Sequence, residues 1–338
     1  MNRIYAEELF SKITYILEKN NVDPKQAQTV ADCMISADAH GIHTHGVNML
    51  WAYVDKLTKG CYDLSAEPVI LKQTSAFATV DSKNMIGMCS ARWCMEYALK
   101  MCEESGIYYV FSKNSNTFGP AFYYTKLAAM EGKIGICLSN TPSAMPAWGG
   151  NKKMLGTNPF SVSVPGNKNG PILLDMATSA VAKSKINEIR KAGGKIPEGW
   201  ALDKYGNPTT DPQEAIEGLM LPMAEYKGYG IAMIIDIIAG VVSGAGFLNS
   251  INRFYSEDNS CMNVGQCFIV IDPKMIHSNK FYDIIDSYID EIHQSGEGVM
   301  IPGERELISE QKSKKYGIEL PDETILKFNE LLLKYKML

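Results

Sequence analysis

Strand-like and helix-like stretches alternate along the middle of the chain, and this alternation limits the possible folds more than any other feature of the sequence. The pattern is typical of an α/β protein, in which helices cover a sheet. The chain has 338 residues and 46% hydrophobic content, enough for about two domains and a sizeable core, which excludes a disordered or fibrous protein. We predict strands at 76–80, 107–112, 134–139, 160–164, 172–175 and 266–271, and helices at 88–102 and 121–131.

Helical patterns flank this region on both sides. Asp23 and Pro24 predict an N-cap and a first-turn proline, and apolar residues then recur at helical spacing until Gly41. A second apolar stripe begins at Val47 and stops at Gly60. We therefore expect 1–73 to be mainly helical, 74–275 to form the α/β domain, and 276–338 to add helices near 278–294 and 321–336.

Charge, cysteine usage and the first residues exclude several partners and compartments. Lys and Arg number 33 against 38 Asp and Glu, a net charge of −5, without a basic block, so we expect neither nucleic acid nor an anionic membrane as a partner. Glu7 and Glu8 interrupt the apolar core that a signal peptide needs, and eight scattered cysteines without a CxxC pair are typical of reduced thiols. Residues 230–248 approach membrane-spanning length, but Asp236 and several glycines favour a buried helix that enters a glycine-rich turn. We predict a cytoplasmic protein.

The common fingerprints of nucleotide and hydrolase sites are absent. The chain has neither the G-x-G-x-x-G of a Rossmann unit nor the G-x-x-x-x-G-K-[ST] of a P-loop, so a nucleotide would need another loop design. It also lacks G-x-S-x-G and H-E-x-x-H, which disfavours a serine hydrolase or a zinc peptidase.

Three of the five histidines, His40, His43 and His45, lie within six residues at the corner between two predicted helices. No second ligand pair accompanies them, so we expect no metal, and we expect His40 and His43 to be partly exposed at a helix end. Thr44 can cap the second helix and place His45 in its first turn, where the helix dipole keeps the imidazole neutral. A neutral imidazole suits proton transfer to and from a substrate oxygen near pH 7.

Two loops and two helix starts are candidates for binding a dinucleotide. In one loop, Gly156 and Thr157 offer donors while Pro159 holds Asn158 extended, although an ordinary connection would look the same. The segment 175–179 follows a predicted strand and opens a helix, which would bring its hydroxyls to the carboxyl edge of the sheet. Lys227 and two glycines begin an apolar helix and favour an anionic phosphate, unless the glycines serve only close packing.

Four segments together, 37–47, 155–159, 175–179 and 226–230, resemble the type-2 malate/L-lactate dehydrogenase family over nearly the whole chain. Members move hydride between NAD or NADP and a small acid. The resemblance implies a non-Rossmann α/β fold, with a mixed-sheet cofactor domain and a helical domain built from the N-terminal and C-terminal segments, the first of which carries the catalytic histidine. It also implies a homodimer with a small-molecule substrate.

By the same resemblance the acid/base residue falls on His45, with Tyr53 two turns further along the helix, and substrate contacts fall on Thr44 and Thr117. No metal ligands are implied. Cofactor contacts fall on Thr141, Gly156, Thr157, Asn158, Asp175, Met176, Ala177, Thr178, Ser179, Lys227, Gly303 and Glu304.

Two positions depart from the family pattern. Met49 stands where many members have an arginine, and Thr117 where many have a histidine, so the substrate carboxylate needs another cation. The leading hypothesis is a 2-hydroxy acid dehydrogenase of the malate, lactate or ureidoglycolate type. A reductase of a cyclic imine or a sugar-derived keto acid, a nucleotide-binding protein without catalysis, and a three-histidine metal-dependent lyase are the alternatives.

Overall fold

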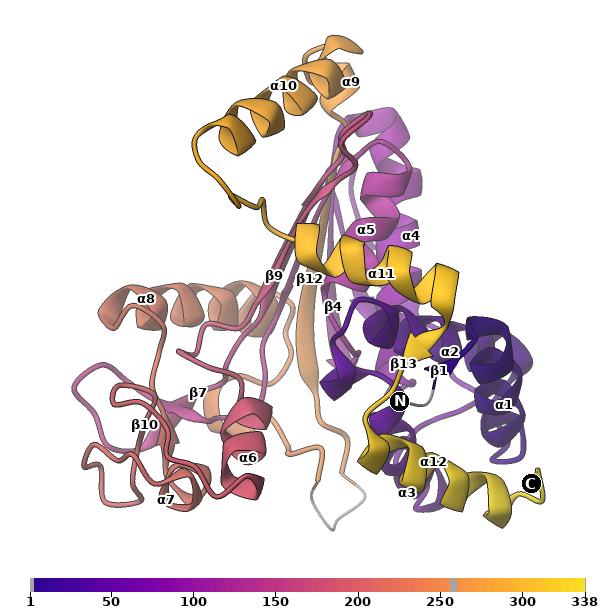
Figure 1. Cartoon of the computed structure of the whole chain (residues 1–338). Helices are drawn as coiled ribbons and strands as arrows, with labels where there is room; N and C mark the ends of the chain where they lie inside the picture. The colour runs from indigo at the N-terminus through magenta and orange to yellow at the C-terminus, as the bar shows by residue number, and fades with distance from the viewer. Residues whose placement is uncertain (1–2, 256–259, 338) are drawn as a thin grey trace.

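The computed structural model describes residues 3–255 and 260–337, and its centre is a seven-stranded mixed sheet (Figure 1). Only β3 and β4 run parallel, and every other neighbouring pair is antiparallel. The predicted mixed α/β architecture is therefore confirmed. In spatial order the strands are β2 (Val69–Gln73), β3 (Phe77–Asp81), β4 (Ile107–Ser115), β12 (Val264–Ile271), β5 (Ile134–Ser139), β8 (Phe160–Val164) and β9 (Ile172–Met176).

Most of the predicted strands agree with the structure to within one to three residues, and β5 and β8 have the predicted bounds. The exception is β2, which falls in the region expected to be mainly helical. All five residues of this edge strand are exposed, so the alternation of buried and exposed positions that reveals a strand is absent.

Two helices cover one face of the sheet. They are α4 (Gly87–Ser105) and α5 (Phe122–Met130), which pack on β4, β12, β5 and β8. Along β4 the residues that face these helices, such as Tyr108 and Val110, are fully buried, whereas Tyr109 on the opposite face is 37% exposed. Figure 1 shows that the middle of this opposite face has no helical layer.

The two ends of the chain pack together beside the sheet. Strand β1 (Arg3–Ile4) pairs with β13 (Ile318–Glu319), and α12 (Asp322–Lys334) contacts both α1 (Ala6–Glu18) and α3 (Leu50–Thr58). Helix α11 (Glu304–Tyr316) contacts α2 (Pro24–Ala39), whose N-terminus is capped by Asp23 as predicted.

One of the C-terminal helices does not pack on the N-terminal helical segment as expected. Helix α10 (Lys280–Gln294), preceded by α9 (Pro273–Ile276), lies at the far end of the sheet from the chain termini (Figure 1). There Tyr282 donates to the carbonyl of Gly132 at 2.9 Å, and the Asp286 carboxylate accepts from backbone N–H groups of the loop at 167–169.

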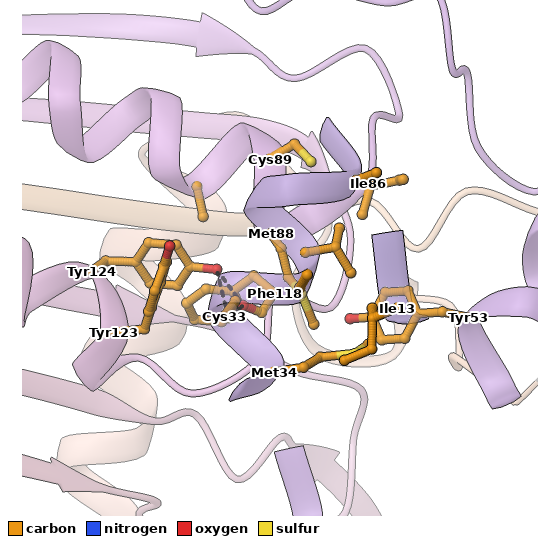
Figure 2. Close-up of a cluster of buried hydrophobic side chains, with 14 of the residues drawn as sticks. Ile13, Cys33, Met34, Tyr53, Ile86, Met88, Cys89, Phe118, Tyr123 and Tyr124 are labelled. Carbon is orange, nitrogen blue, oxygen red and sulfur yellow. Dashed lines mark hydrogen bonds between the residues drawn. The ribbon is translucent and has the colours of Figure 1, made fainter. Parts of the chain in front are cut away.

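One hydrophobic core joins the helical segment to the sheet. Figure 2 shows Cys33 and Met34 of α2 with Tyr53 of α3 and Met88 of α4 in this cluster. The hydroxyl of Tyr124 donates to the Phe118 carbonyl at the same place. Because side chains from both regions fill one core, the helical segment is held rigidly against α4 and α5.

A smaller lobe lies beyond the sheet edge. It contains β6 (Met145–Pro146), β7 (Lys153–Leu155), α6 (Lys183–Lys191), β10 (Ala201–Leu202), α7 (Pro212–Glu217) and β11 (Leu219–Met220).

Helix α8 (Tyr226–Ile235) continues into a π-helical segment at Asp236–Val241. The expectation of a buried helix is wrong for one face of this unit, because Ile234 is 51% and Val242 53% exposed. Among the described residues, no helix is long and apolar enough to cross a membrane.

Candidate functional site

The histidine corner is built around one buried carboxylate, that of Asp38 near the end of α2. One oxygen of this carboxylate accepts from the Val47 backbone N–H, and the other accepts from Nδ1 of His43, both at 2.7 Å. A Cβ on Gly46 would collide with the same carboxyl group, so the turn requires glycine there. These contacts fix the 3₁₀ turn His43–His45 and thereby the backbone of His45.

The predicted cap of the second helix is wrong. Thr44 caps nothing, and its hydroxyl is hydrogen-bonded at 2.9 Å to Nδ1 of His45, which lies in the 3₁₀ turn and not in the first turn of α3. Solvent reaches the His45 ring, yet protein surrounds it on many sides, and this desolvation lowers its pKa. A lowered pKa favours the neutral imidazole at pH 7, but the position in the first turn of α3 on which this expectation was based is wrong.

His40 also differs from its predicted environment, because it is buried and not partly exposed. Its Nδ1–H donates to the Ser36 carbonyl at 2.7 Å, and its Nε2 accepts from Lys126 at 3.0 Å, so the ring is neutral. Burial and the Lys126 charge lower its pKa. Within the described residues no group of three or more His, Cys, Asp or Glu is placed to hold a metal ion.

Tyr53 and Thr117 meet inside the protein. The buried Tyr53 hydroxyl donates to the Thr117 carbonyl at 3.1 Å, and burial raises its pKa well above the ordinary value. Tyr53 thus links α3 to the segment that follows β4. Met49, in the 3₁₀ turn Val47–Met49, is contacted at 3.6 Å by the hydroxyl of Tyr255.

Three of the predicted cofactor residues converge where β5 and β8 meet the smaller lobe. The buried amide oxygen of Asn158 accepts from the Thr141 backbone N–H at 3.0 Å, and its amide nitrogen donates to Ala232 of α8. A Cβ on Gly156 would collide with Thr141, so only glycine allows this approach.

The segment Asp175–Ser179 joins the same cluster but does not open a helix, because α6 begins only at Lys183. The backbone N–H of Thr178 and its hydroxyl both donate to the Thr157 carbonyl, at 2.9 and 3.0 Å. Met176 ends β9 opposite Phe160, and Ala177 follows it. The Ser179 hydroxyl donates to Val181, so neither hydroxyl of this segment is free as a donor.

Asp175 lines a cavity of about 340 Å³ between β9, α5 and the start of α11. Its carboxylate accepts from the Phe122 backbone N–H at 2.9 Å. Gly303 lines the same cavity, and the adjacent Pro302 carbonyl accepts from Leu173 at 3.0 Å. Glu304 accepts from His293 and from the Ile301 backbone N–H, both at 2.9 Å. The histidine in this cavity wall is His40, and His45 is not part of it.

Replacement of Asp175 by asparagine tests the state of this carboxyl group. Burial raises the pKa of Asp175 to about 7, while the ordinary value is 3.8, so the folded state retains a proton that the unfolded state loses. Stability conferred by this group therefore falls as pH rises from 3.8 towards about 7. We expect Asp175→Asn to raise Tm relative to wild type at about pH 8 and to raise it less at about pH 5. A Tm difference that is independent of pH, measured by calorimetry, would contradict this assignment.

Lys227 is exposed at the start of α8. The two residues before the helix, Ala224 and Glu225, have φ of 44° and 59°, a backbone conformation unfavourable for residues with side chains. The turn is tied to the cofactor cluster, because the Met223 N–H donates to the Thr178 carbonyl at 2.9 Å. Strained backbone of this kind concentrates at functional sites.

Sequence reasoning missed two groups that shape the site. Asp38 lies within a recognised segment, but nothing in the sequence shows that its carboxylate holds Val47 and His43. The Phe122 N–H that meets Asp175 is 53 residues away along the chain, and no local pattern signals such a contact.

Comparison with known proteins confirms the resemblance. A family model described as malate/L-lactate dehydrogenase matches residues 4–329. A malate/(S)-sulfolactate dehydrogenase of Methanothermus fervidus is 36% identical over 97% of this chain and 96% of its own length. A ureidoglycolate dehydrogenase (NAD(+)) of Escherichia coli is 31% identical over 95% and 93% of the two chains. The solved structure of a sulfolactate dehydrogenase from Methanocaldococcus jannaschii has a TM-score of 0.92 and 34% identity over 99% and 98% of the chains. The chain belongs to the malate/L-lactate dehydrogenase family.

Proposed function

We propose that this protein is an NAD(P)-dependent dehydrogenase that interconverts a small 2-hydroxy acid and its 2-oxo acid. The observation that carries the proposal is the match of nearly the whole chain to dehydrogenases of such acids, among them malate and sulfolactate. Relatives use NAD(+) or NADP(+), so the family does not decide between the two cofactors. The sheet, with one parallel pair among seven strands, supports a non-Rossmann fold.

The residues present fit a dinucleotide. The cavity beside Asp175 and Gly303 offers a recess, and the exposed Lys227 offers a cation for a phosphate. These residues would hold the cofactor, and the Thr141 N–H would keep the Asn158 side chain in place. When bound, the nicotinamide supplies or accepts the hydride.

His45 is the proposed acid/base residue. Its Nδ1 is engaged by Thr44, so Nε2 is the nitrogen that exchanges a proton with the substrate oxygen. In the oxidative direction neutral Nε2 takes the hydroxyl proton, and in the reductive direction the protonated ring returns it. Tyr53 orients this site through the Thr117 segment that its hydroxyl holds.

We also infer a homodimer, and exposed apolar surfaces support it. Five exposed residues form the apolar face of α8 and the π segment: Ile231, Ile234, Ile237, Val241 and Val242.

The uncovered face of the sheet is apolar as well, with Ile107 and Tyr109 more than a third exposed. A second copy of this chain offers both surfaces and can bury both, and exposed apolar side chains that gather in this way favour an interface. Seven of the eight cysteines are buried, which fits reduced thiols and a cytoplasmic location.

A substrate panel tests the proposed activity. NADH and NADPH oxidation is followed spectroscopically with oxaloacetate, pyruvate, sulfopyruvate and Δ1-piperideine-2-carboxylate. We expect turnover with at least one 2-oxo acid and slower turnover with the cyclic imine. Nucleotide binding, seen as enhanced NADH fluorescence, without oxidation by any member of the panel would contradict the proposal.

A further inference from the structure

A buried polar network adjoins the Asp175 cavity and takes no part in the proposed reaction. Its centre is Lys126 of α5, whose ammonium group donates to the Glu310 carboxylate of α11 at 2.8 Å and to Nε2 of His40 at 3.0 Å. His40 in turn donates from Nδ1 to the Ser36 carbonyl of α2 at 2.7 Å. We call Lys126, Glu310 and His40 the Lys126 network. It joins three helices that come from distant parts of the chain.

Water has little access to the Lys126 network. The side chains of Lys126, Glu310 and His40 are 15%, 17% and 1% exposed. Solvent screens an exposed ion pair, so its loss changes little, whereas removal of one partner from a shielded pair leaves the other poorly compensated. Loss of the Lys126 ammonium group would take the shared donor from both Glu310 and His40.

The ion pair of the network lies one helical turn from the cavity on two helices. On α5, Phe122 lines the cavity and Lys126 follows it by four residues. On α11, Glu306 lines the cavity and Glu310 follows it by four residues. Residues four apart lie on the same face of a helix. The ion pair therefore holds together the two helix faces that form the cavity wall.

His40 belongs both to the network and to the cavity wall. Its ring lies against the Phe122 ring, with centroids 4.6 Å apart. The Phe122 backbone N–H donates to the Asp175 carboxylate at 2.9 Å. By holding Nε2 of His40, Lys126 thus fixes a ring that supports the beginning of α5, where Asp175 is bound.

The start of α11 needs accurate placement, because it approaches the sheet closely. A Cβ on Gly303 would collide with Leu173 of β9, and the Leu173 N–H donates to the Pro302 carbonyl at 3.0 Å. Gly303 and Glu304 are also expected cofactor contacts. A small displacement of α11 would therefore move both the cavity wall and these contacts, and binding sites tolerate such displacements poorly.

We propose that Lys126 is a positioning residue for the dinucleotide: through Glu310 and His40 it holds the start of α11 against α5 and keeps the cavity in the shape that receives the cofactor. Lys126 and Glu310 are not among the residues that line the cavity, so they act through its shape and not by contact. The inference rests on the proposed function, because it assumes that the cavity receives NAD(H) or NADP(H).

The test compares Lys126→Gln and Glu310→Gln, which break the ion pair from either side, with Lys314→Gln as the matched control. Lys314 also pairs with Glu310, at 2.9 Å, but it is exposed and lies on α11 itself. Its loss removes an equal charge from the same carboxylate without detaching α11 from α5. Lys126→Arg keeps the charge and donors for both partners. Calorimetry gives Tm and shows that each variant is folded.

Two quantities are measured: hydrogen–deuterium exchange of residues 301–316 without nucleotide, and the Kd of NADH and of NADPH by fluorescence titration. We expect Lys126→Gln to speed this exchange and to raise Kd by about tenfold, because only molecules with a docked α11 bind the cofactor. At saturating nucleotide kcat should stay within about twofold, since His45 is unchanged. Lys126→Arg should restore most of the affinity, and Lys314→Gln should change Kd less than about twofold.

Unchanged exchange of residues 301–316 in both Lys126→Gln and Glu310→Gln would overturn the role of the ion pair in holding α11. Faster exchange with an unchanged Kd, or a loss confined to kcat, would overturn the positioning role. Failure of the proposed function looks different, because the wild-type protein would then bind neither NADH nor NADPH. The exchange measurement would still decide whether Lys126 holds the start of α11.

Discussion

Replacement of His45 by alanine is expected to lower kcat by about a hundredfold or more and to leave the Kd of NADH within about twofold of wild type. The reason is that Nε2 of His45 exchanges the proton that must move together with the hydride, whereas the proposed cofactor contacts lie on other segments. Stopped-flow turnover and fluorescence titration measure the two quantities separately.

The pH profile of the same reaction carries independent information. Because desolvation lowers the pKa of His45 below 6.5, we expect oxidation to fall off only at pH values below that number. The alanine variant should lose this acid limb. Exposed His277, beside α9 at the far end of the sheet, provides the matched control, and His277→Ala should retain full activity. A His45→Ala enzyme with near-normal kcat would remove this residue from the mechanism.

The second prediction with a large expected effect concerns the oligomeric state of the protein. Ile234 and Ile237 are 51% and 41% exposed at the centre of the apolar face of α8. Introducing aspartate at both positions buries two carboxylates in any interface formed there, which is strongly unfavourable without partners. We expect the wild-type protein to have twice the chain mass in solution and Ile234→Asp/Ile237→Asp to have the chain mass, measured by light scattering after size exclusion.

Leu326 on α12 is 65% exposed but lies outside this face, so Leu326→Asp is the control and should leave the mass unchanged. Because Lys227 begins the same helix, monomerisation is also expected to weaken NADH binding. A wild-type protein with the mass of one chain, or an aspartate variant that remains dimeric, would contradict the proposed interface.

Local patterns predicted most of the fold because local physics decides it. Strands β5 and β8 alternate between more and less buried residues, and Asp23 caps α2 through the backbone N–H groups of Lys25 and Gln26. The edge strand β2 has no such alternation and was missed. The path of α10 could not be foreseen, because Asp286 meets a loop 117 to 119 residues earlier in the chain.

For the candidate site, too, one part could be predicted from the sequence and another part could not. The motif residues around Asn158 and Thr178 were identified from sequence, and the structure brings them together. The geometry around His45 was not foreseen, because it depends on Asp38, on Gly46 and on the absence of the helix cap expected from Thr44. Tertiary contacts set these features, and the helix dipole invoked for His45 does not act on it as expected, because the ring is not in the first turn of α3.

The pairing of β1 with β13 has a consequence for biosynthesis. Arg3 and Glu319 are neighbours in space although 316 positions separate them, and α12 then closes over α1 and α3. The first helices leave the ribosome long before β13 is made, so their apolar sides remain exposed to solvent throughout elongation. The region that carries His45 is therefore completed late in the maturation of a newly made chain. Until then, the chain should be unusually dependent on chaperones.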